Sequence, residues 1–317
     1  MRWGILGCGS IATAAIAPAM RWSTTGELRA VGSRTEARAR DRAELVGAWE
    51  AYGSYDALLA DPEVDAIYIG VPNGEHARWA LAAAEAGKHV LCDKSLALSV
   101  DDARAMREAF RAKKLRLVEG FMVRHHPQWT LLRELLDAGA IGTVRHVRSW
   151  FRAGLEAEDD HRWSATLGGG ALFDVGCYPI NAARFVFQSE PLRAQATSSW
   201  KSKGVDISTD ALLDFVGGGV ASIHGSLRAP FEEGLVVSGD KGRIVLERPF
   251  VSHWDAVDVI LERHGTREVR HVEGANHFLH MIEHVEACIL DPEKPLAPAE
   301  DGAANVAACM LVRIAAQ

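Results

Sequence analysis

The chain has 317 residues, of which 48% are hydrophobic and 24% are charged, and its formal net charge is −7. This balance is typical of a globular protein, and the length is enough for one large domain or two ordinary ones. The negative charge argues against a general nucleic-acid surface, because such a surface needs basic patches that displace counterions. No apolar run approaches the ~20 residues that span a bilayer.

Cysteine usage and the start of the chain bear on its location. The five cysteines are odd in number and widely spaced, without a C-x-x-C pair, which favours thiols in a reducing compartment. A glycine loop begins at Gly7, which leaves no room for a signal peptide before it. We therefore expect a cytoplasmic protein that contacts neither nucleic acid nor membrane.

The first part of the chain alternates short apolar runs with helical patterns. Such alternation predicts a parallel, doubly wound sheet, an α/β Rossmann domain, over residues 1–120. The expected strands are Trp3–Leu6, Leu28–Gly32, Ala66–Val71, His89–Cys92 and Leu115–Glu119. Helices are expected at Ile11–Trp22, after Thr35 to about Val46, at Glu75–Ala86, and after a Ser99/Asp102 capping box to about Lys113.

The pattern changes after about Phe121 to one helix, Pro127–Ala138, followed by strands with glycine-rich turns at 217–219 and 239–242. These strands are Val144–Phe151, Arg193–Trp200, Ala211–Phe215, Val220–Ser226, Leu235–Ser238, Ile244–Glu247 and Val257–Leu261. Helical patterns at Asn276–Leu290 and Ala299–Ala316 close the chain. Residues 121–317 are therefore predicted to form an α+β domain with a large, mostly antiparallel sheet, for substrate binding and oligomerisation.

The loop Gly7-Cys8-Gly9-Ser10-Ile11-Ala12 lies between the first expected strand and helix. Gly7 allows a tight turn, Gly9 lets the backbone approach a pyrophosphate, and Ala12 lets the helix pack closely on the strand. The helix N-terminus presents free N–H groups and a positive dipole end to the phosphates. The loop predicts a nicotinamide dinucleotide site, against the alternative of a plain glycine turn.

The end of the second strand bears on the choice of cofactor. A site for NAD commonly has a carboxylate there for the ribose hydroxyls. This chain has Ser33, Arg34 and Arg38 instead. A serine hydroxyl and two guanidinium groups suit a 2′-phosphate, so NADP is favoured and NAD remains possible.

Two further motifs stand where cofactor and substrate are expected to meet. Asp93 and Lys94 follow a parallel strand at its carboxyl end, where ligands bind in open α/β sheets. Three glycines at 168–170 precede Asp174 and Tyr178, which are four residues apart and share one helix face. Pro179 follows, so the helix either has just begun or is bent there.

Together these motifs resemble the glucose–fructose oxidoreductase/inositol dehydrogenase (Gfo/Idh/MocA) family over essentially the whole chain. The branch that is most similar contains dimeric dihydrodiol dehydrogenase and NADP-dependent xylose dehydrogenase, because it too has tyrosine in the last motif. The matching segments are Gly7-x-Gly9-x-x-Ala12, Asn73-Gly74-Glu75-His76, Asp93-Lys94-Ser95, residues 119–127 and Gly168-Gly169-Gly170 through Asp174-x-Gly176-x-Tyr178.

The resemblance implies roles for individual residues. Pro72, Asn73, His76 and Asp93 are expected beside the cofactor, and Lys94 at both cofactor and substrate. The family commonly has Glu-Lys-Pro where this chain has serine after Lys94, which is expected to loosen the backbone. Many relatives also have histidine in place of tyrosine in the last motif.

Proton transfer needs a base near the substrate hydroxyl, since the cofactor supplies only the hydride chemistry. A tyrosine has a pKa near ~10, and a neighbouring ammonium stabilises its phenolate. We assign Tyr178 as general acid/base, Lys94 as its electrostatic partner and Asp174 as an orienting carboxylate. The alternative exchanges the roles of Tyr178 and Lys94.

Weaker signals complete the candidate site. Arg162 and Trp163 suit a polyhydroxylated ligand, and His126 is a candidate for the substrate cleft. Histidines at positions 277, 280 and 284 share a helix face. A polar face is favoured there over a metal site, so no metal is predicted.

The expected activity is hydride transfer between NADP and a sugar or polyol hydroxyl, or its carbonyl, in a homodimer or homotetramer. Two alternatives from other classes stay open. One is a redox-silent regulator that binds NADP, and the other is a hydrolase or epimerase that retains its cofactor and uses transient oxidation.

Overall fold

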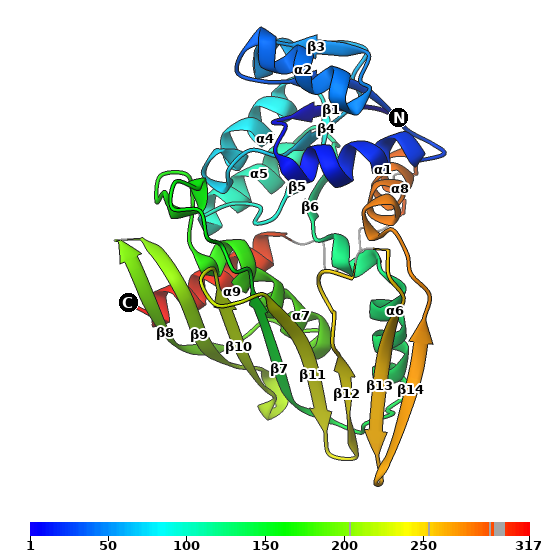
Figure 1. Ribbon diagram of the computed structural model, residues 1–317, viewed down its shortest axis with the longest axis vertical. Helices are drawn as coiled ribbons and strands as arrows, with labels where there is room; N and C mark the ends of the chain where they lie inside the picture. The colour runs from blue at the N-terminus through cyan, green and yellow to red at the C-terminus, as the bar shows by residue number, and fades with distance from the viewer. Residues whose placement is uncertain (203, 253, 292, 295–301) are drawn as a thin grey trace. The chain divides into compact units, whose positions relative to one another are not determined.

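The computed structural model describes residues 1–202, 204–252, 254–291, 293–294 and 302–317 (Figure 1). The chain forms two compact units. The first comprises Met1–Met122 with the described part of Phe278–Ala303, and the second comprises Val123–His277 and Ala304–Gln317. A single division after residue 120 does not describe this arrangement, because a late helix belongs to the first unit.

That late helix is α8 (His277–Leu290). Its apolar residues, including Met281, Ile282 and Val285, join the core around β1 (Arg2–Leu6). The buried carboxylate of Glu286 accepts a hydrogen bond from Trp3 Nε1 at 2.7 Å. Sequence periodicity predicts such a helix but does not show which core receives its apolar face.

The first unit contains a six-stranded sheet in the order β3-β2-β1-β4-β5-β6. Its strand pairs are parallel, which confirms the predicted Rossmann sheet. The strands after β1 are β2 (Glu27–Gly32), β3 (Glu50–Tyr52), β4 (Ala66–Ile69), β5 (His89–Asp93) and β6 (Leu117–Gly120). Strand β3 is not predicted by the sequence, because three residues are too few to show a period.

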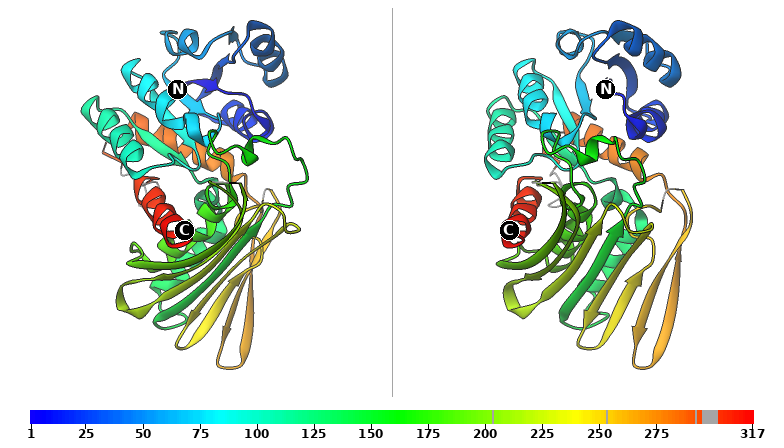
Figure 2. Two further views of the ribbon diagram at one scale, coloured as in Figure 1. Left: turned by 90° about the vertical axis from the view of Figure 1, so that its left-hand side faces the viewer. Right: turned by 60° about the vertical axis from the view of Figure 1, so that its left-hand side comes forward.

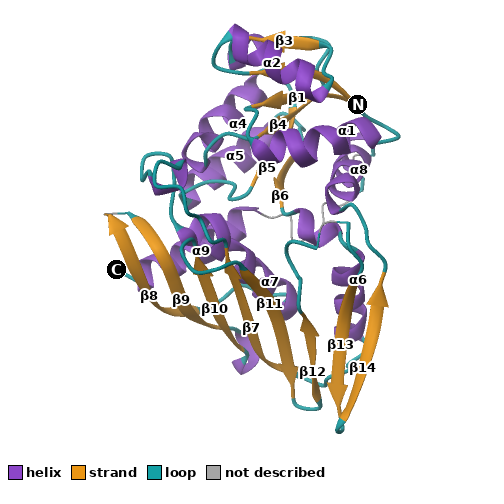
Figure 3. Cartoon of the chain, in the orientation of Figure 1, coloured by secondary structure: helices purple, strands orange, loops and turns teal. Residues whose placement is uncertain are grey.

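The helices of the first unit alternate with these strands (Figure 3). They are η1 (Ala12–Ile16), α1 (Ala17–Trp22), α2 (Glu36–Val46), α3 (Tyr55–Leu59), η2 (Asn73–Glu75), α4 (His76–Glu85) and α5 (Val100–Ala112), besides α8. Two predicted N-caps are confirmed: Thr35 accepts from the N–H of Arg38, and Ser99 accepts from that of Asp102. Helix α3 has only five residues and is not predicted.

The second unit contains an eight-stranded sheet in the order β14-β13-β12-β11-β7-β10-β9-β8, whose twist is visible in Figure 2. The β7–β10 pair is parallel and the other pairs are antiparallel, which confirms a mostly antiparallel sheet. The strands are β7 (Val144–Arg152), β8 (Arg193–Ser202), β9 (Val205–Asp214), β10 (Val220–Ser226), β11 (Glu232–Gly239), β12 (Gly242–Leu246), β13 (Val257–Arg263) and β14 (Thr266–Val272). Both predicted glycine-rich turns connect antiparallel neighbours.

Strand β14 is not predicted, because it is a largely exposed and polar edge strand. The helices of this unit are η3 (Met122–His125), α6 (Pro127–Asp137), η4 (His161–Trp163), η5 (Leu172–Gly176), α7 (Cys177–Phe187), η6 (Val216–Gly218) and α9 (Gly302–Ala315). The expected start of the last helix, residue 299, lies outside the described residues. Helix α7 packs on β7 and β10, and α6 packs on β13.

Two further observations concern the cysteines and the helices. All five cysteines are described and buried, and none is part of a disulfide. Within the described part of the chain, no helix combines the length and apolarity that a membrane crossing requires.

Candidate active site

The glycine loop joins β1 to η1 in a conformation that requires glycine at its first position. Gly7 has φ +91°, and a Cβ added there would lie 2.7 Å from Val71 Cγ1 and 2.8 Å from the carbonyl oxygen of Gly70. Gly9, Ser10 and Ile11 are exposed at the start of the helix. The predicted phosphate loop therefore has an open backbone surface and a helix N-terminus behind it.

Three arginines lie at four-residue spacing after β2. Arg34 and Arg38 are exposed, and the half-buried Arg42 follows one turn later on α2. Ser33 differs from the expectation for a phosphate ligand: its side chain is 3% exposed, and its backbone N–H bonds to Tyr52 O at 2.9 Å. The exposed polar side chains available to a phosphate in this segment are therefore those of Arg34 and Arg38, whereas Ser33 is buried.

Electrostatics connect this basic group to the phosphate loop. Burial raises the pKa of the Cys8 thiol to about 11, and the charges of Arg42 and Arg38 oppose that rise. Arg42 is thus a candidate cofactor residue that the sequence analysis missed. The signal that could have found it is the i, i+4 repeat from Arg34 through Arg38.

An aromatic pair lies beside the same arginines. Tyr55, the first residue of α3, meets Trp79 edge-on, with ring centroids 4.9 Å apart. Burial raises the pKa of Tyr55, and the charges of Arg34 and Arg38 oppose this rise. The sequence analysis singled out neither residue: Tyr55 lies on α3, which has too few residues to show a periodic pattern, and Trp79 is a buried residue of α4.

Lys94 follows β5 at the carboxyl edge of the parallel sheet. Its backbone N–H donates to Asp93 Oδ1 at 2.9 Å, and the Lys94–Ser95 peptide bond is cis. Ser95 is buried, and the N–H of the next residue, Leu96, donates to Glu119 Oε1 at 2.7 Å. The segment is therefore held by neighbouring groups, although serine replaces the family's proline and was expected to loosen it.

His76 holds the same segment from the β4 side. Its side chain is fully buried, with Nδ1 2.8 Å from Ser95 O and Nε2 2.8 Å from Val71 O. Burial lowers the pKa of His76, and a neutral imidazole donates to only one of these carbonyls at a time. His76 therefore affects the site through Ser95, while Pro72 and Asn73 remain half-buried beside it.

In the second unit, the triple-glycine segment passes very close to η4. The N–H of Gly170 donates to Arg162 O at 2.9 Å, and a Cβ added to Gly169 would lie 2.2 Å from the same oxygen. Gly168 and Gly170 have φ of +77° and +114°. These positions need glycine, as the motif predicts.

Asp174 lies on η5 and pairs with Arg162, whose Nε donates to Asp174 Oδ2 at 2.9 Å. The same guanidinium contacts Asp160 at 3.1 Å through Nη1. Arg162 was expected only as a substrate contact, and the structure brings it to the predicted orienting carboxylate. The side chain of Asp174 retains 18% exposure, so one edge of this pair reaches the surface of its unit.

Tyr178 lies one turn after Asp174 and is 6% exposed. Its ring packs against Phe151 at 5.3 Å and Phe250 at 5.4 Å between centroids. Pro179 is the third residue of α7, directly after the π-helical turn η5. The helix type changes just before the proline, at a place where its missing N–H is tolerated.

The two weaker substrate candidates have clear local roles. The ring of Trp163 lies between Lys201 Nζ, at 4.4 Å, and the guanidinium carbon of Arg228, at 4.9 Å. His126 is fully buried and caps α6 by accepting the N–H of Gln128 at 3.2 Å. Burial of His126 gives no support to its expected place in a substrate cleft.

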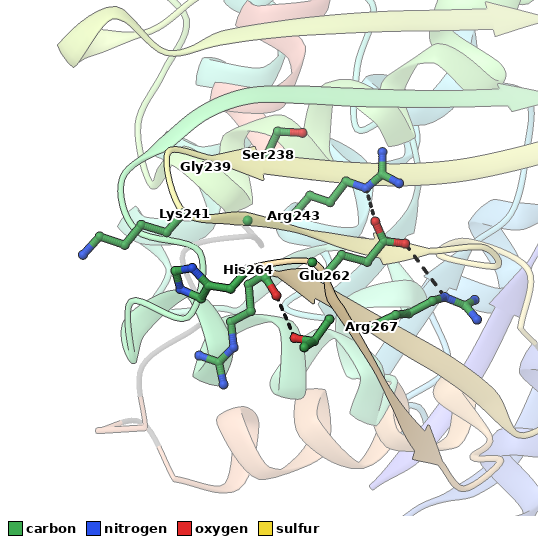
Figure 4. A pocket seen from close by; sticks show the side chains of 11 residues that line it. Ser238, Gly239, Lys241, Arg243, Glu262, His264 and Arg267 are labelled. Atoms are coloured by element: carbon green, nitrogen blue, oxygen red, sulfur yellow. Dashed lines mark hydrogen bonds and ion pairs between the residues drawn. The ribbon is translucent and has the colours of Figure 1, made fainter.

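Metal-binding groups and a surface pocket are two further kinds of candidate site. Among the described residues, no group of three or more His, Cys, Asp or Glu side chains is arranged to hold a metal. A pocket of about 460 Å³ lies at the hairpin ends of β11–β14, where Arg243 and Arg267 both pair with Glu262 (Figure 4). None of the predicted site residues lines this pocket.

Comparisons with known proteins place the chain in a family. Residues 1–121 match the model of an oxidoreductase family with an NAD-binding Rossmann fold, and residues 129–245 match the GFO/IDH/MocA C-terminal domain. An NADP(+)-linked D-xylose 1-dehydrogenase of Haloferax volcanii is 39% identical over 77% of this chain and 75% of that protein. A dTDP-3,4-didehydro-2,6-dideoxy-α-D-glucose 3-reductase of Actinomadura kijaniata is 30% identical over 100% of this chain and 96% of its own.

Solved structures agree with this assignment. A 3-ketoreductase from Actinomadura kijaniata, in complex with NADP and TDP-benzene, superposes with a TM-score of 0.93 at 31% identity, covering 100% of this chain and 98% of that one. An aldose–aldose oxidoreductase from Caulobacter crescentus gives a TM-score of 0.91 at 27% identity, with 100% and 97% covered. The chain therefore belongs to the Gfo/Idh/MocA family of oxidoreductases.

Proposed function

We propose that the protein is an NADP-dependent oxidoreductase that transfers a hydride between the nicotinamide and a sugar or polyol hydroxyl, or the matching carbonyl. The observation that carries this proposal is that Lys94, Asp174 and Tyr178 occur together on the scaffold of an oxidoreductase family. A protein that only binds a dinucleotide needs none of the three.

The first unit fits the cofactor. The surface over Gly7 and Gly9 leaves room for a pyrophosphate against the backbone, and Gly7 has no space for a side chain on its inner side. Arg34, Arg38 and Arg42 would meet a 2′-phosphate with charge-assisted hydrogen bonds. When bound, the nicotinamide supplies the acceptor or donor of the hydride.

The substrate proton is assigned to Tyr178. In the oxidative direction its phenolate Oη accepts the hydroxyl proton while the carbinol hydrogen leaves as hydride, and the substrate becomes a carbonyl. The ammonium of Lys94 would stabilise that phenolate. Supporting this pair, the Actinomadura ketoreductase has solved variants at one tyrosine and one lysine, and their separation in its sequence equals that of Tyr178 and Lys94 here.

Exchanged roles, with Lys94 as the proton-transfer group, remain the alternative. A pH–rate profile separates the two assignments. If Tyr178 is the base, Tyr178→Phe removes the ionisation that shapes the profile, whereas Lys94→Ala shifts it to higher pH. If Lys94 is the base, Tyr178→Phe leaves that ionisation in place.

The Arg162–Asp174 pair would orient the sugar. A carboxylate accepts hydrogen bonds from hydroxyls, and a guanidinium donates to them, so the pair offers both partners that a polyol needs. The relatives include enzymes named for xylose, for a dTDP-linked keto sugar and for aldoses. We therefore propose a free or nucleotide-linked sugar as substrate.

A substrate screen tests the proposal. The purified protein is mixed with NADP+ and aldoses, inositols or dihydrodiols, and with NADPH and dTDP-keto sugars, while nicotinamide absorbance is followed. Turnover supports the proposal. Tight NADP binding without turnover would indicate a regulator, and bond cleavage or epimerisation without net cofactor change would indicate transient oxidation.

A homodimer or homotetramer in a reducing, cytoplasmic setting is proposed as well. The absence of disulfides among the five buried cysteines supports the reducing compartment. Sedimentation equilibrium of the intact chain tests the oligomeric state, and a single monomeric species would contradict it.

A further inference from the structure

We infer that Asp206 is a positioning residue that fixes the start of the helical segment carrying Asp174 and Tyr178. Asp206 is the second residue of β9, and its side chain does not belong to the predicted site. The inference rests on the proposed function only for its catalytic consequence. The structural part, that Asp206 holds the segment, stands on contacts within the second unit.

The contacts of Asp206 are those of a helix cap supplied from a neighbouring strand. Asp206 is 5% exposed, and its Oδ2 accepts the backbone N–H of Leu172 at 2.8 Å. The same oxygen accepts the hydroxyl of Thr209 at 2.7 Å. Leu172 is the first residue of η5, so the carboxylate satisfies an N–H that the helix itself leaves without a backbone acceptor.

Glycines at the two ends of η5 and on β10 let strands β9 and β10 come close to the backbone of η5. A Cβ added to Gly170 would lie 2.3 Å from Asp206 Oδ1. A Cβ added to Gly225 of β10 would lie 2.8 Å from the Cα of Gly176 at the other end of η5. The π-helical turn is thus fixed at both ends, at its start by Asp206 of β9 and at its end by the bare backbone of β10.

Helix α9 also contacts the segments around Asp206 and the start of η5. Arg313 donates from Nη2 to Gly204 O at 3.3 Å, just before Asp206, and its guanidinium carbon lies 5.6 Å from the ring of Phe173. Burial raises the pKa of Asp206, while the hydrogen bonds from Thr209 and Leu172 and the charge of Arg313 oppose that rise. A buried carboxylate is costly, and here its hydrogen bonds offset part of that cost.

The consequence concerns geometry at the reacting groups. Asp174 is two residues after Leu172, and Tyr178 is six residues after it. The segment is also held from the opposite side, because Gly170 donates to Arg162 O and Arg162 pairs with Asp174. Without Asp206 the start of η5 would be held only through Gly170 and Arg162, while its end would still rest on β10. An error of about 1 Å in placing a catalytic group can lower the rate about 100-fold.

The test compares Asp206→Ala and Asp206→Asn with Glu286→Ala in the full-length protein. Glu286 is also a buried carboxylate, which accepts Trp3 Nε1 in the first unit and has no predicted part in the site. For Asp206→Ala we expect kcat to fall about 10- to 100-fold while the Kd for NADPH changes less than twofold. Asp206→Asn keeps one acceptor oxygen for Leu172 and is expected to recover most of kcat.

Amide hydrogen exchange supplies a readout that does not depend on turnover. The N–H of Leu172 is expected to lose at least tenfold protection in Asp206→Ala and to keep it in Glu286→Ala. Should Asp206→Ala fail to fold, the exchange rate and kcat of Asp206→Asn are compared with those of the wild type, with a smaller change in the same direction expected.

Unchanged protection of Leu172 in Asp206→Ala would overturn the inference, and so would an equal fall of kcat in Glu286→Ala. Lost protection with unchanged kcat would overturn the catalytic part. If the wild type turns over none of the sugars, the proposed function fails, and the exchange data still decide whether Asp206 holds the segment.

Discussion

The candidate residues of the two units stand in different surroundings. In the first unit, the candidate cofactor residues lie on loops and first helical turns after parallel strands, and Arg34 and Arg38 reach solvent on exposed side chains. In the second unit, Asp174 and Tyr178 stand on a helix locked by glycine contacts, a buried carboxylate and aromatic packing. A long, exposed side chain can take another conformation when a neighbouring residue is substituted. In a closely packed helix, the same kind of substitution displaces the side chains that the helix carries.

The largest expected effect is that of Tyr178→Phe. This change removes the hydroxyl and keeps the ring that packs on Phe151 and Phe250. We expect kcat to fall about 10²- to 10⁴-fold, the usual contribution of general acid–base catalysis, with the melting temperature nearly unchanged. Steady-state kinetics and a thermal melt check this. A variant that keeps near-wild-type turnover would remove Tyr178 from proton transfer.

A matched pair of glycine substitutions tests how tightly the second unit is packed. Gly170 and Gly217 have φ of +114° and +82°, but only at Gly170 would a Cβ meet a neighbour, Asp206 Oδ1 at 2.3 Å. Each alanine is expected to cost about 1–3 kcal/mol for the backbone conformation, and Gly170→Ala more than Gly217→Ala because of the added clash. Urea unfolding of both variants measures the difference. Equal losses would mean that the Gly170–Asp206 approach has no energetic weight.

Arginine substitutions test the adjustable character of the first unit. Arg34→Gln and Arg38→Gln are each expected to weaken NADPH binding about 10-fold, since a hydrogen bond to a charged group contributes about 1.5–3 kcal/mol. NADH binding should be nearly unchanged, because NADH has no 2′-phosphate. Fluorescence titration gives both dissociation constants. A parallel loss for NADH and NADPH would place these arginines elsewhere than at the 2′-phosphate.

The smallest expected effect concerns pH and His76. Burial lowers its pKa in the folded protein, so the unfolded chain binds the proton more readily and stability falls as pH drops below about 6.5. The slope from one such group is at most about 1.4 kcal/mol per pH unit. Unfolding free energies at pH 7.5 and 5.5 are expected to differ less in His76→Asn than in the wild type. The same two unfolding free energies are measured for His89→Asn, because burial also lowers the pKa of His89. If His76→Asn leaves the pH dependence unchanged, His76 is not the group that titrates.

Sequence periodicity and capping residues predict most of this fold, because Thr35, Ser99 and the glycine-rich turns act locally. Short or polar elements escape such patterns, as β3, α3 and β14 do. Among the candidate site residues, the glycine loop, Lys94, Asp174 and Tyr178 are visible as motifs. Contacts between distant segments are not, which is why the Arg162–Asp174 pair, the burial of Ser33 and His126, and the role of Asp206 emerge only from the structure.

Tracing the hydrogen from the sugar to the nucleotide tests the proposed hydride transfer most directly. The protein is incubated with NADP+ and a sugar deuterated at its carbinol carbons, and the nucleotide is analysed by mass spectrometry. Hydride transfer predicts that one deuterium appears in the reduced nucleotide with wild-type protein, and almost none with Tyr178→Phe. Bound NADP that gains no deuterium from any sugar, polyol or nucleotide-linked sugar would contradict the claim.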